Sequence, residues 1–218
     1  MDRNLGAMSA EIGNNSTAGG LFYEYGRKEP FNNSNNRYNI KGVRLGGAIA
    51  ASIQTSASIC FCYVIKNPNN YIYDNNRGDW CYVNPYSGNK WNNPSWFTSQ
   101  GEITLFDPCP QGWTLPRQNV FKELASVQNA DSFNRGYSFY LSGIKSSFAG
   151  MTWFPATGII CGSGGYFTLS GSYGVIRFGT IGDKYMVIQN GNVNQNNGPI
   201  SVYNYGITNG YNIRCIQE

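Results

Sequence analysis

Short runs of alternating apolar and polar residues fill the second half of the chain, and they restrict the possible folds more than any other feature. The runs read YSFYLSGI, TWFPATGII, YFTLSGSYGVIRFG, KYMVIQ, ISVYNYGI and YNIRCI, and Gly or Asn separates them. A period of two is typical of strands, while Gly and Asn favour the turns between them. Residues from Tyr137 to Ile216 are therefore predicted to form antiparallel strands.

One segment of the first half is predicted to be helical because of its aromatic residues. In GLFYEYGR, residues 20–27, the side chains of Leu21, Phe22 and Tyr25 can share one helical face. A polar loop, NNSNNRYN, follows it.

A second helix is predicted in TLPRQNVFKELASVQ, residues 114–128. Thr114 is a suitable N-cap, and Pro116 stands early, where its missing N–H is harmless. An apolar stripe follows at helical spacing, made of Val120, Phe121, Leu124 and Val127. Helices early and strands late predict one α+β domain over residues 1–218.

The region between these helices is predicted to be a strand followed by a long loop. Residues 59–65 alternate, so Cys60 and Cys62 share a face and are poorly placed to bond to each other. Residues 66–101 are rich in Asn, Tyr and Trp and form the long loop region, in which Cys81 is a plausible staple.

The six cysteines indicate an oxidising compartment, because an even number occurs in an Asn- and Tyr-rich chain. Sequence alone does not choose among the possible disulfide pairings of the six cysteines. The alternative to disulfides is that most of the cysteines are buried free thiols. No CxxC pair is present, which argues against a zinc ribbon or a thioredoxin-like motif.

Charge and hydropathy argue against two classes of partner. The net charge is +4, but the basic residues are scattered, so nucleic-acid binding is not expected. The longest apolar run is far shorter than the roughly 20 residues of a membrane span, so no direct span is expected. No secretory n-region and h-region stand at Met1, and we expect either a leader upstream or another route of export.

The residues of common catalytic and metal sites are missing or incomplete. The chain has no histidine, which excludes Ser-His and Cys-His nucleophiles and His-ligated zinc. The carboxylates are spread over different motifs, and nothing pairs them as a glycosidase requires. DNNRGD, residues 74–79, lacks the final Glu of a calcium loop and is better explained as a turn. We therefore expect no enzyme activity, no catalytic residue, no metal and no cofactor.

Six motifs in a fixed order resemble one known family. They are MDRNLGA (1–7), GLFYEYGRKEPF (20–31), IKNPNNYI (65–72), DPCPQGWTLP (107–116), FPATG (154–158) and GYNIRCI (210–216). Together they resemble the Fibrobacter succinogenes major paralogous domain family, which are surface-exposed modules of Bacteroidetes and related bacteria. The resemblance covers nearly the whole chain and departs from the family at Tyr25, Glu29 and Thr114, where Trp, Asp and Arg are usual.

The resemblance implies a C-type-lectin-like fold, with two helices, short and mostly antiparallel strands, and long loops. It also implies that Cys109 and Cys215 lie close together, so we expect a disulfide between them. No pairing follows for the remaining cysteines, Cys60, Cys62, Cys81 and Cys161. The sugar-binding calcium motifs of animal C-type lectins are absent, so calcium-dependent sugar binding is not inherited from the fold.

The Asn- and Tyr-rich C-terminal region is the predicted binding surface. Tyr gives a large, rigid contact, and Asn both donates and accepts hydrogen bonds. The predicted ligand-binding residues are Tyr173, Asn190, Asn192, Asn194, Asn196, Asn197, Tyr203, Tyr205 and Asn209. Ordinary solvated loops, with half of these tyrosines in the core, are the alternative. Trp91, Trp96 and Trp153 are further candidates to stack on sugars, Trp153 being better suited to the core.

C-type-lectin-fold proteins are frequent targets of diversity-generating retroelements, which mutate adenines. Asn codons are rich in adenine, so the region from about Tyr166 suits such a target.

The function expected from this resemblance is a cell-surface ligand-binding or adhesion module, such as a lipoprotein or a pilus-tip adhesin. Its partner would be a glycan or a host or bacterial surface protein, and its location extracellular or on the outer surface of a bacterium. One alternative is a receptor-binding protein of a phage tail, located on the virion. Another is a structural pilus or cell-wall subunit without its own ligand. The sequence leaves the ligand and the oligomeric state open.

Overall fold

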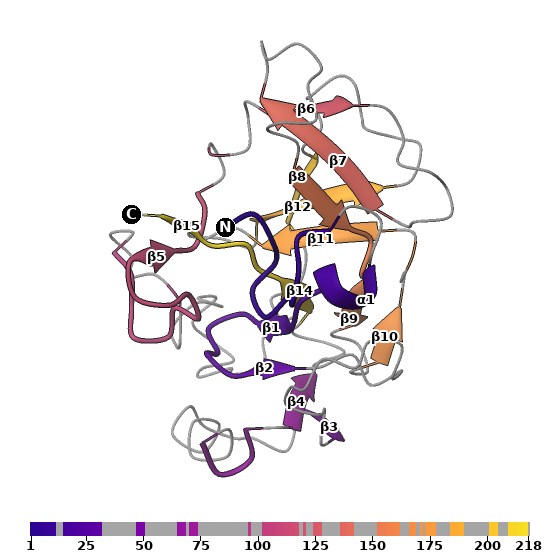
Figure 1. The fold of residues 1–218 in the computed structure, drawn as a ribbon. Helices are drawn as coiled ribbons and strands as arrows, with labels where there is room; N and C mark the ends of the chain where they lie inside the picture. Colours follow the sequence, from indigo (N-terminus) through magenta and orange to yellow (C-terminus); the bar gives the residue numbers. More distant parts are fainter. Residues whose placement is uncertain are drawn as a thin grey trace.

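The computed structural model shows a strand-rich molecule (Figure 1). It describes residues 1–11, 15–31, 47–50, 65–68, 70–73, 96, 102–117, 120, 124–127, 136–141, 152–161, 166–168, 171, 173–177, 184–189, 201–204 and 209–217. The strands are β1 (Phe22–Glu24), β2 (Pro30–Phe31), β3 (Gly47–Ala50), β4 (Asn70–Tyr73), β5 (Trp113–Thr114), β6 (Leu124–Val127), β7 (Gly136–Leu141), β8 (Thr152–Pro155), β9 (Ile159–Cys161), β10 (Tyr166–Thr168), β11 (Tyr173–Arg177), β12 (Lys184–Gln189), β13 (Ser201–Asn204), β14 (Gly210–Asn212) and β15 (Ile216–Gln217). Helix α1 (Asn15–Ala18) has only four residues.

The main sheet is built around β14, near the end of the chain. Its strands follow the order β10-β9-β14-β11-β12-β13, and β1 joins β14 with β2 beside it. Gly210 of β14 pairs with both Glu24 of β1 and Ile160 of β9. A strand has only two edges, so β1 and β9 lie on opposite edges of β14. The beginning of the chain is therefore joined to its end at the centre of this sheet.

Three smaller sheets flank the main one. Strands β6, β7 and β8 form an antiparallel sheet, and the short pair β15–β5 joins the C-terminal residues to the segment after Cys109. Strands β3 and β4 pair in parallel and lie at the opposite end of the molecule from β6 (Figure 1). Gly136 of β7 leaves room for the ring of Trp153, because a Cβ there would lie 2.1 Å from it.

Strand β1 is buried on both faces. Tyr23 belongs to a core cluster around the disulfide, whose other members are Leu21, Tyr25, Trp96, Cys109, Leu115, Ile213 and Cys215. Phe22, the neighbour of Tyr23, belongs to a second cluster with Phe31, Tyr71 and Ile160. Successive side chains of a strand point to opposite faces, so the two clusters lie on the two sides of β1.

The helix predicted over residues 20–27 is wrong. Residues Phe22–Glu24 form β1, and a turn follows in which the Arg27 N–H donates to the Glu24 carbonyl at 3.1 Å. A strand buried on both faces carries apolar residues at successive positions, which hides the alternation that identifies a strand.

The helix predicted over residues 114–128 is also wrong. Thr114 lies in β5, and residues Leu124–Val127 form β6. Strand β5 pairs with β15 and β6 pairs with β7, so contacts with distant segments override the local apolar period. The expected two-helix α+β fold of C-type-lectin-like type is therefore contradicted by a strand-rich structure of mainly antiparallel sheets.

Strands do occur where alternation predicted them in the second half of the chain. Strand β12 coincides with the run KYMVIQ, β8, β10, β11 and β13 fall within other runs, and β7, β9 and β14 each extend one residue beyond theirs. The alternating residues 59–64 lie outside the described part of the chain. Of the predicted loop region 66–101, Asn70–Tyr73 form β4.

Candidate functional site

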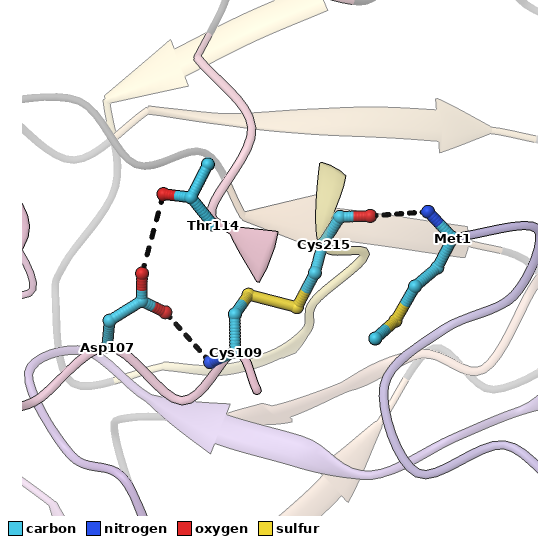
Figure 2. Close-up of a disulfide and its surroundings, with 5 residues drawn as sticks. All are labelled: Met1, Asp107, Cys109, Thr114 and Cys215. Carbon is cyan, nitrogen blue, oxygen red and sulfur yellow. Dashed lines mark hydrogen bonds between the residues drawn. A yellow bond between two sulfur atoms is a disulfide. The ribbon is translucent and has the colours of Figure 1, made fainter. Parts of the chain in front are cut away.

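The disulfide between Cys109 and Cys215 is present, as the resemblance implied (Figure 2). It joins residues 106 apart in sequence, with Cα atoms separated by 5.9 Å. Both cysteines are buried in the core cluster that includes Tyr25 and Trp96. Cys161 is half-buried in β9, and Cys60, Cys62 and Cys81 lie outside the described residues.

Asp107 closes the loop that carries Cys109. Its carboxylate accepts hydrogen bonds from the Cys109 N–H at 2.8 Å and the Thr114 hydroxyl at 3.5 Å (Figure 2). Burial raises the pKa of Asp107, while the hydrogen bonds from Cys109, Leu115 and Thr114 lower it. The motif DPCPQGWTLP thus forms a loop with internal hydrogen bonds. The disulfide attaches this loop to Cys215, directly before the last strand, β15.

The first residues of the chain are held against the last ones. The Met1 amino group donates to the Cys215 carbonyl at 2.7 Å (Figure 2), and the Leu5 N–H donates to the Ile213 carbonyl at 2.7 Å. The first and last segments of the chain are thus joined by these two hydrogen bonds as well as by the pairing of β1 with β14.

Buried Arg214 links three parts of the molecule. Its guanidinium donates to Asn4 Oδ1 at 3.2 Å and to the Trp153 carbonyl, and it lies 3.9 Å from the centre of the Phe154 ring. Burial lowers the pKa of Arg214 to about 9, and Asp2 raises it in opposition. Amide, carbonyl and ring contacts therefore hold this cation inside the core.

A second buried cation connects β1 to the turn before β4. Arg27 Nη1 donates to Glu24 Oε2 at 2.9 Å and to the Asn70 carbonyl at 2.9 Å, and Nη2 donates to the Pro68 carbonyl at 3.0 Å. Arg27 thereby joins the motifs at 20–31 and 65–72.

Arg177 completes this buried cluster from β11. Its guanidinium lies over the rings of Tyr211, Tyr25 and Trp96, at 4.5, 5.2 and 5.9 Å from their centres. Burial raises the pKa of Glu24 to about 8, against the lowering effects of Arg27 and Arg177. All of these charged groups are enclosed in the core, so they connect parts of the frame and offer no surface to a ligand.

Two of the three candidate tryptophans are core residues. Trp96 and Trp153 are both buried, and Trp96 Nε1 donates to the Arg27 carbonyl at 3.1 Å. Neither presents a ring to a sugar in this structure. Trp91 lies outside the described residues.

Tyr173 is the predicted binding residue that the structure places next to the Asn-rich stretch. It begins β11, is half-buried and pairs with Gln189, the last residue of β12. The next residues along the chain, 190–200, join β12 to β13, the last strand in the order of the main sheet. The predicted residues Asn190, Asn192, Asn194, Asn196 and Asn197 belong to this connection and lie outside the described part.

Of the remaining predicted residues, Tyr203 lies in β13 opposite Tyr185, two residues from the end of the strand that meets the connection. Tyr205 comes directly after β13 in the chain, beyond the other end of that strand, and lies outside the described residues. Strand β12 runs five residues between these ends, or roughly 17 Å at about 3.4 Å per residue. Tyr173 and Tyr203 are therefore the predicted binding residues that the structure describes on β11 to β13.

Asn209 belongs to the core. Its side chain is only 8% exposed, and its Nδ2 donates to the Tyr211 hydroxyl at 2.7 Å. Its carbonyl accepts a hydrogen bond from Arg177 at 3.3 Å. Nearby Asn212 is fully buried as well, where it accepts from the Thr157 hydroxyl and donates to the Leu21 carbonyl at 2.8 Å. Asparagine richness predicted a binding surface from composition, but at Asn209 and Asn212 it marks buried polar positions instead.

Sequence reasoning missed two features. One is the set of buried arginines, for which the available signal was an aromatic residue within three positions of each: Tyr25 before Arg27, Phe178 after Arg177 and Tyr211 before Arg214. The other is an exposed apolar turn at Ile103–Phe106, for which consecutive apolar residues before the buried Asp107 were the available signal.

Comparisons with known proteins add no relative. Protein-family models, curated proteins and solved structures were compared with the chain, and none matched it. Within the described ranges, no three Cys, Asp or Glu side chains gather as metal ligands would. None of the helices in that part of the chain is long and apolar enough to cross a bilayer.

Proposed function

We propose that this protein is a cell-surface ligand-binding or adhesion module of the Fibrobacter succinogenes major paralogous domain type, exposed to an oxidising environment. The partner is a glycan or a surface protein. The contact surface is the end of the β11–β12–β13 strands where Tyr173 meets the Asn-rich connection 190–200.

The pairing of Tyr173 with Gln189 is the observation that carries this proposal. It puts a partly exposed phenol beside the point where the chain enters five asparagines in eight residues. Amides supply paired donors and acceptors for sugar hydroxyls or peptide groups, and tyrosine supplies a flat apolar contact at low entropic cost.

The rigid support behind this surface favours the same function. The disulfide, the buried arginines and the bonds between the first and last residues hold β14 and the segments around it, and β11, β12 and β13 extend the same sheet to the connection. Binding loops are commonly held by such scaffolds, because a preorganised surface loses less entropy on binding. The disulfide is also typical of proteins outside the cytosol.

A binding assay on a glycan array and on bacterial and host cells tests the proposal. Tyr173→Ala and the pair Asn194→Ala/Asn197→Ala should each weaken binding by roughly 30-fold, the effect of losing about 2 kcal/mol at an interface. Tyr205→Ala is the matched control, because it removes the same side chain at the other end of the strands. It should leave binding within about twofold of the starting protein, the range of near-neutral positions.

The opposite pattern would move the site. Loss of binding in Tyr205→Ala with full binding in the other variants would place the surface at the far end of the strands. No binding in any format would favour a structural subunit without its own ligand.

A further inference from the structure

The turn Thr104–Asp107 and the residue before it, Ile103, expose large apolar side chains. Leu105 is 91% exposed, Ile103 43% and Phe106 37%, so three of four consecutive residues present apolar atoms to solvent. Single exposed apolar residues are ordinary, but adjacent ones on one turn are a common mark of an interaction site.

The geometry of this turn makes the exposure unusual. The Asp107 N–H donates to the Thr104 carbonyl at 3.1 Å, so Leu105 and Phe106 are the two central residues of a β-turn. Gly, Pro, Asn, Asp and Ser dominate such positions. A Leu-Phe pair is therefore an uncommon choice at the centre of a turn, and Leu105 in particular leaves its side chain almost entirely in solvent.

The turn is held rigidly from both sides. The Thr104 N–H donates to the carbonyl of buried Trp96 at 2.9 Å, and the Phe106 N–H donates to the Thr104 hydroxyl at 3.2 Å. Asp107 then bonds to Cys109, which the disulfide fixes to the last strand. The apolar side chains therefore project from a fixed support.

The chemistry of the turn favours a lipid surface over a protein pocket. Binding hot spots between proteins are enriched in Trp, Tyr and Arg and poor in Leu, whereas Leu, Ile and Phe are the side chains that enter hydrocarbon most favourably. Entry into lipid also requires that backbone groups be bonded internally, and the N–H groups of Thr104, Phe106 and Asp107 are.

The charges around the turn suit an anionic lipid. Lys28 is exposed and lies close enough to Asp107 to lower the pKa of that carboxyl, and Arg117 is exposed further along the same loop. Glu102 is the acidic residue at the start of the turn, while the chain as a whole carries a net charge of +4. Cations at the level of the headgroups strengthen shallow insertion into anionic membranes.

We propose that Ile103, Leu105 and Phe106 insert into the surface of an anionic lipid bilayer, so that this turn docks the protein on a membrane independently of the ligand surface near Tyr173.

Flotation with lipid vesicles tests this inference on the full chain. The protein should float with vesicles of phosphatidylcholine containing a quarter phosphatidylglycerol. Leu105→Ser combined with Phe106→Ser should lower the bound fraction by about tenfold or more, because two apolar side chains are lost from the contact. Leu105→Phe keeps an apolar side chain and should retain binding.

Ile65→Ser is the matched control. Ile65 is 74% exposed in a different motif, so its loss removes a comparable apolar side chain away from the turn. Binding should stay within about twofold of the starting protein if only the turn inserts.

Several results would overturn the inference. They are no flotation with the phosphatidylglycerol-containing vesicles, equal flotation of the Leu105→Ser/Phe106→Ser variant, or an equal loss in Ile65→Ser. A dimer in sedimentation velocity that the double substitution converts to monomer would assign the turn to a second copy of the chain instead.

Discussion

Glu24 is a fully buried carboxyl group among buried cations and tyrosines. Arg27 lies 2.9 Å away, and Arg177 and Tyr71 interact with it electrostatically. Burial dominates and raises the pKa of Glu24 to about 8, so the folded state binds its proton more tightly than the unfolded chain does. The contribution of the protonated Glu24 to the free energy of unfolding is therefore fully present below the ordinary pKa of a glutamate. It is lost as the pH rises toward 8.

The Glu24→Gln variant should reveal this dependence. Between about pH 4.5 and pH 8 the free energy of unfolding of the original protein should fall relative to that of the variant, by at most roughly 5 kcal/mol. Urea titrations of both proteins across this range measure the difference. The chain has no histidine to titrate in the same window. A difference that is constant with pH, or one that grows in favour of the original protein as the pH rises, would contradict the prediction.

At the scale of elements, β14 and the loop around Cys109 are the parts that depend most on a covalent link. Strand β14 lies between β1 on one edge and β9 and β11 on the other, and Cys215 follows it three residues later. Among the described residues, the loop ending in β5 is attached by the disulfide, the two-residue pairing with β15, the bonds of Asp107 and the hydrogen bond from Thr104 to Trp96. The disulfide therefore carries a large share of the attachment of this loop.

Replacing both cysteines, as Cys109→Ala/Cys215→Ala, should lower the free energy of unfolding by roughly 4–5 kcal/mol, since the bond closes a loop of 106 residues. Alanine leaves no new buried polar group. Denaturant unfolding compares the variant with the original protein under non-reducing conditions. A loss below about 1 kcal/mol would mean that the loop is held without the bond.

The element scale also explains which parts of the fold could be predicted. Alternation predicted β7 because apolar residues stand at every second position of YSFYL in the sequence. The segments at β1 and β6 were mistaken for helices. Burial on both faces hid the period in β1, and β6 is a strand through its pairing with β7, which begins nine residues later.

For the whole molecule, the connection between the first and last segments of the chain is the main organising feature. Asn4 is buried, donates to the Gly19 carbonyl at 3.1 Å and accepts from Arg214 at 3.2 Å. Figure 1 shows both ends of the chain on the same side of the main sheet. Asn4 thus couples the segment before β1 to the segment after β14.

Asn4→Leu should destabilise the whole molecule by about 1–3 kcal/mol or more, because it removes an acceptor from a buried cation and a donor from a buried carbonyl. Thermal unfolding followed by circular dichroism measures the effect. Arg3→Ala is the control one residue away, because Arg3 is exposed and pairs only with neighbouring Asp2 and the Met8 carbonyl among its described contacts. We expect no measurable change in the control, and equal melting temperatures for both variants would contradict the role of Asn4.

The predicted binding residues show how local and long-range information differ. Composition predicted Tyr173 and Asn209 as ligand-binding residues, and both fit that criterion equally well. Only the pairing of β11 with β12 placed Tyr173 beside the Asn-rich connection, and only the packing of β14 buried Asn209 against Tyr211 and Arg177.

The sequence by itself determined the strands of the second half, the resemblance of six motifs and, through it, the Cys109–Cys215 bond. The strands follow from the local period, which needs no knowledge of neighbours, whereas the Cys109–Cys215 bond was expected only because the resemblance implies it. The tertiary structure alone decided that β1 and β6 are strands, that Trp96 and Asn209 belong to the core, and that Leu105 is exposed. Burial and strand pairing depend on residues distant in the chain, so no local pattern specifies them.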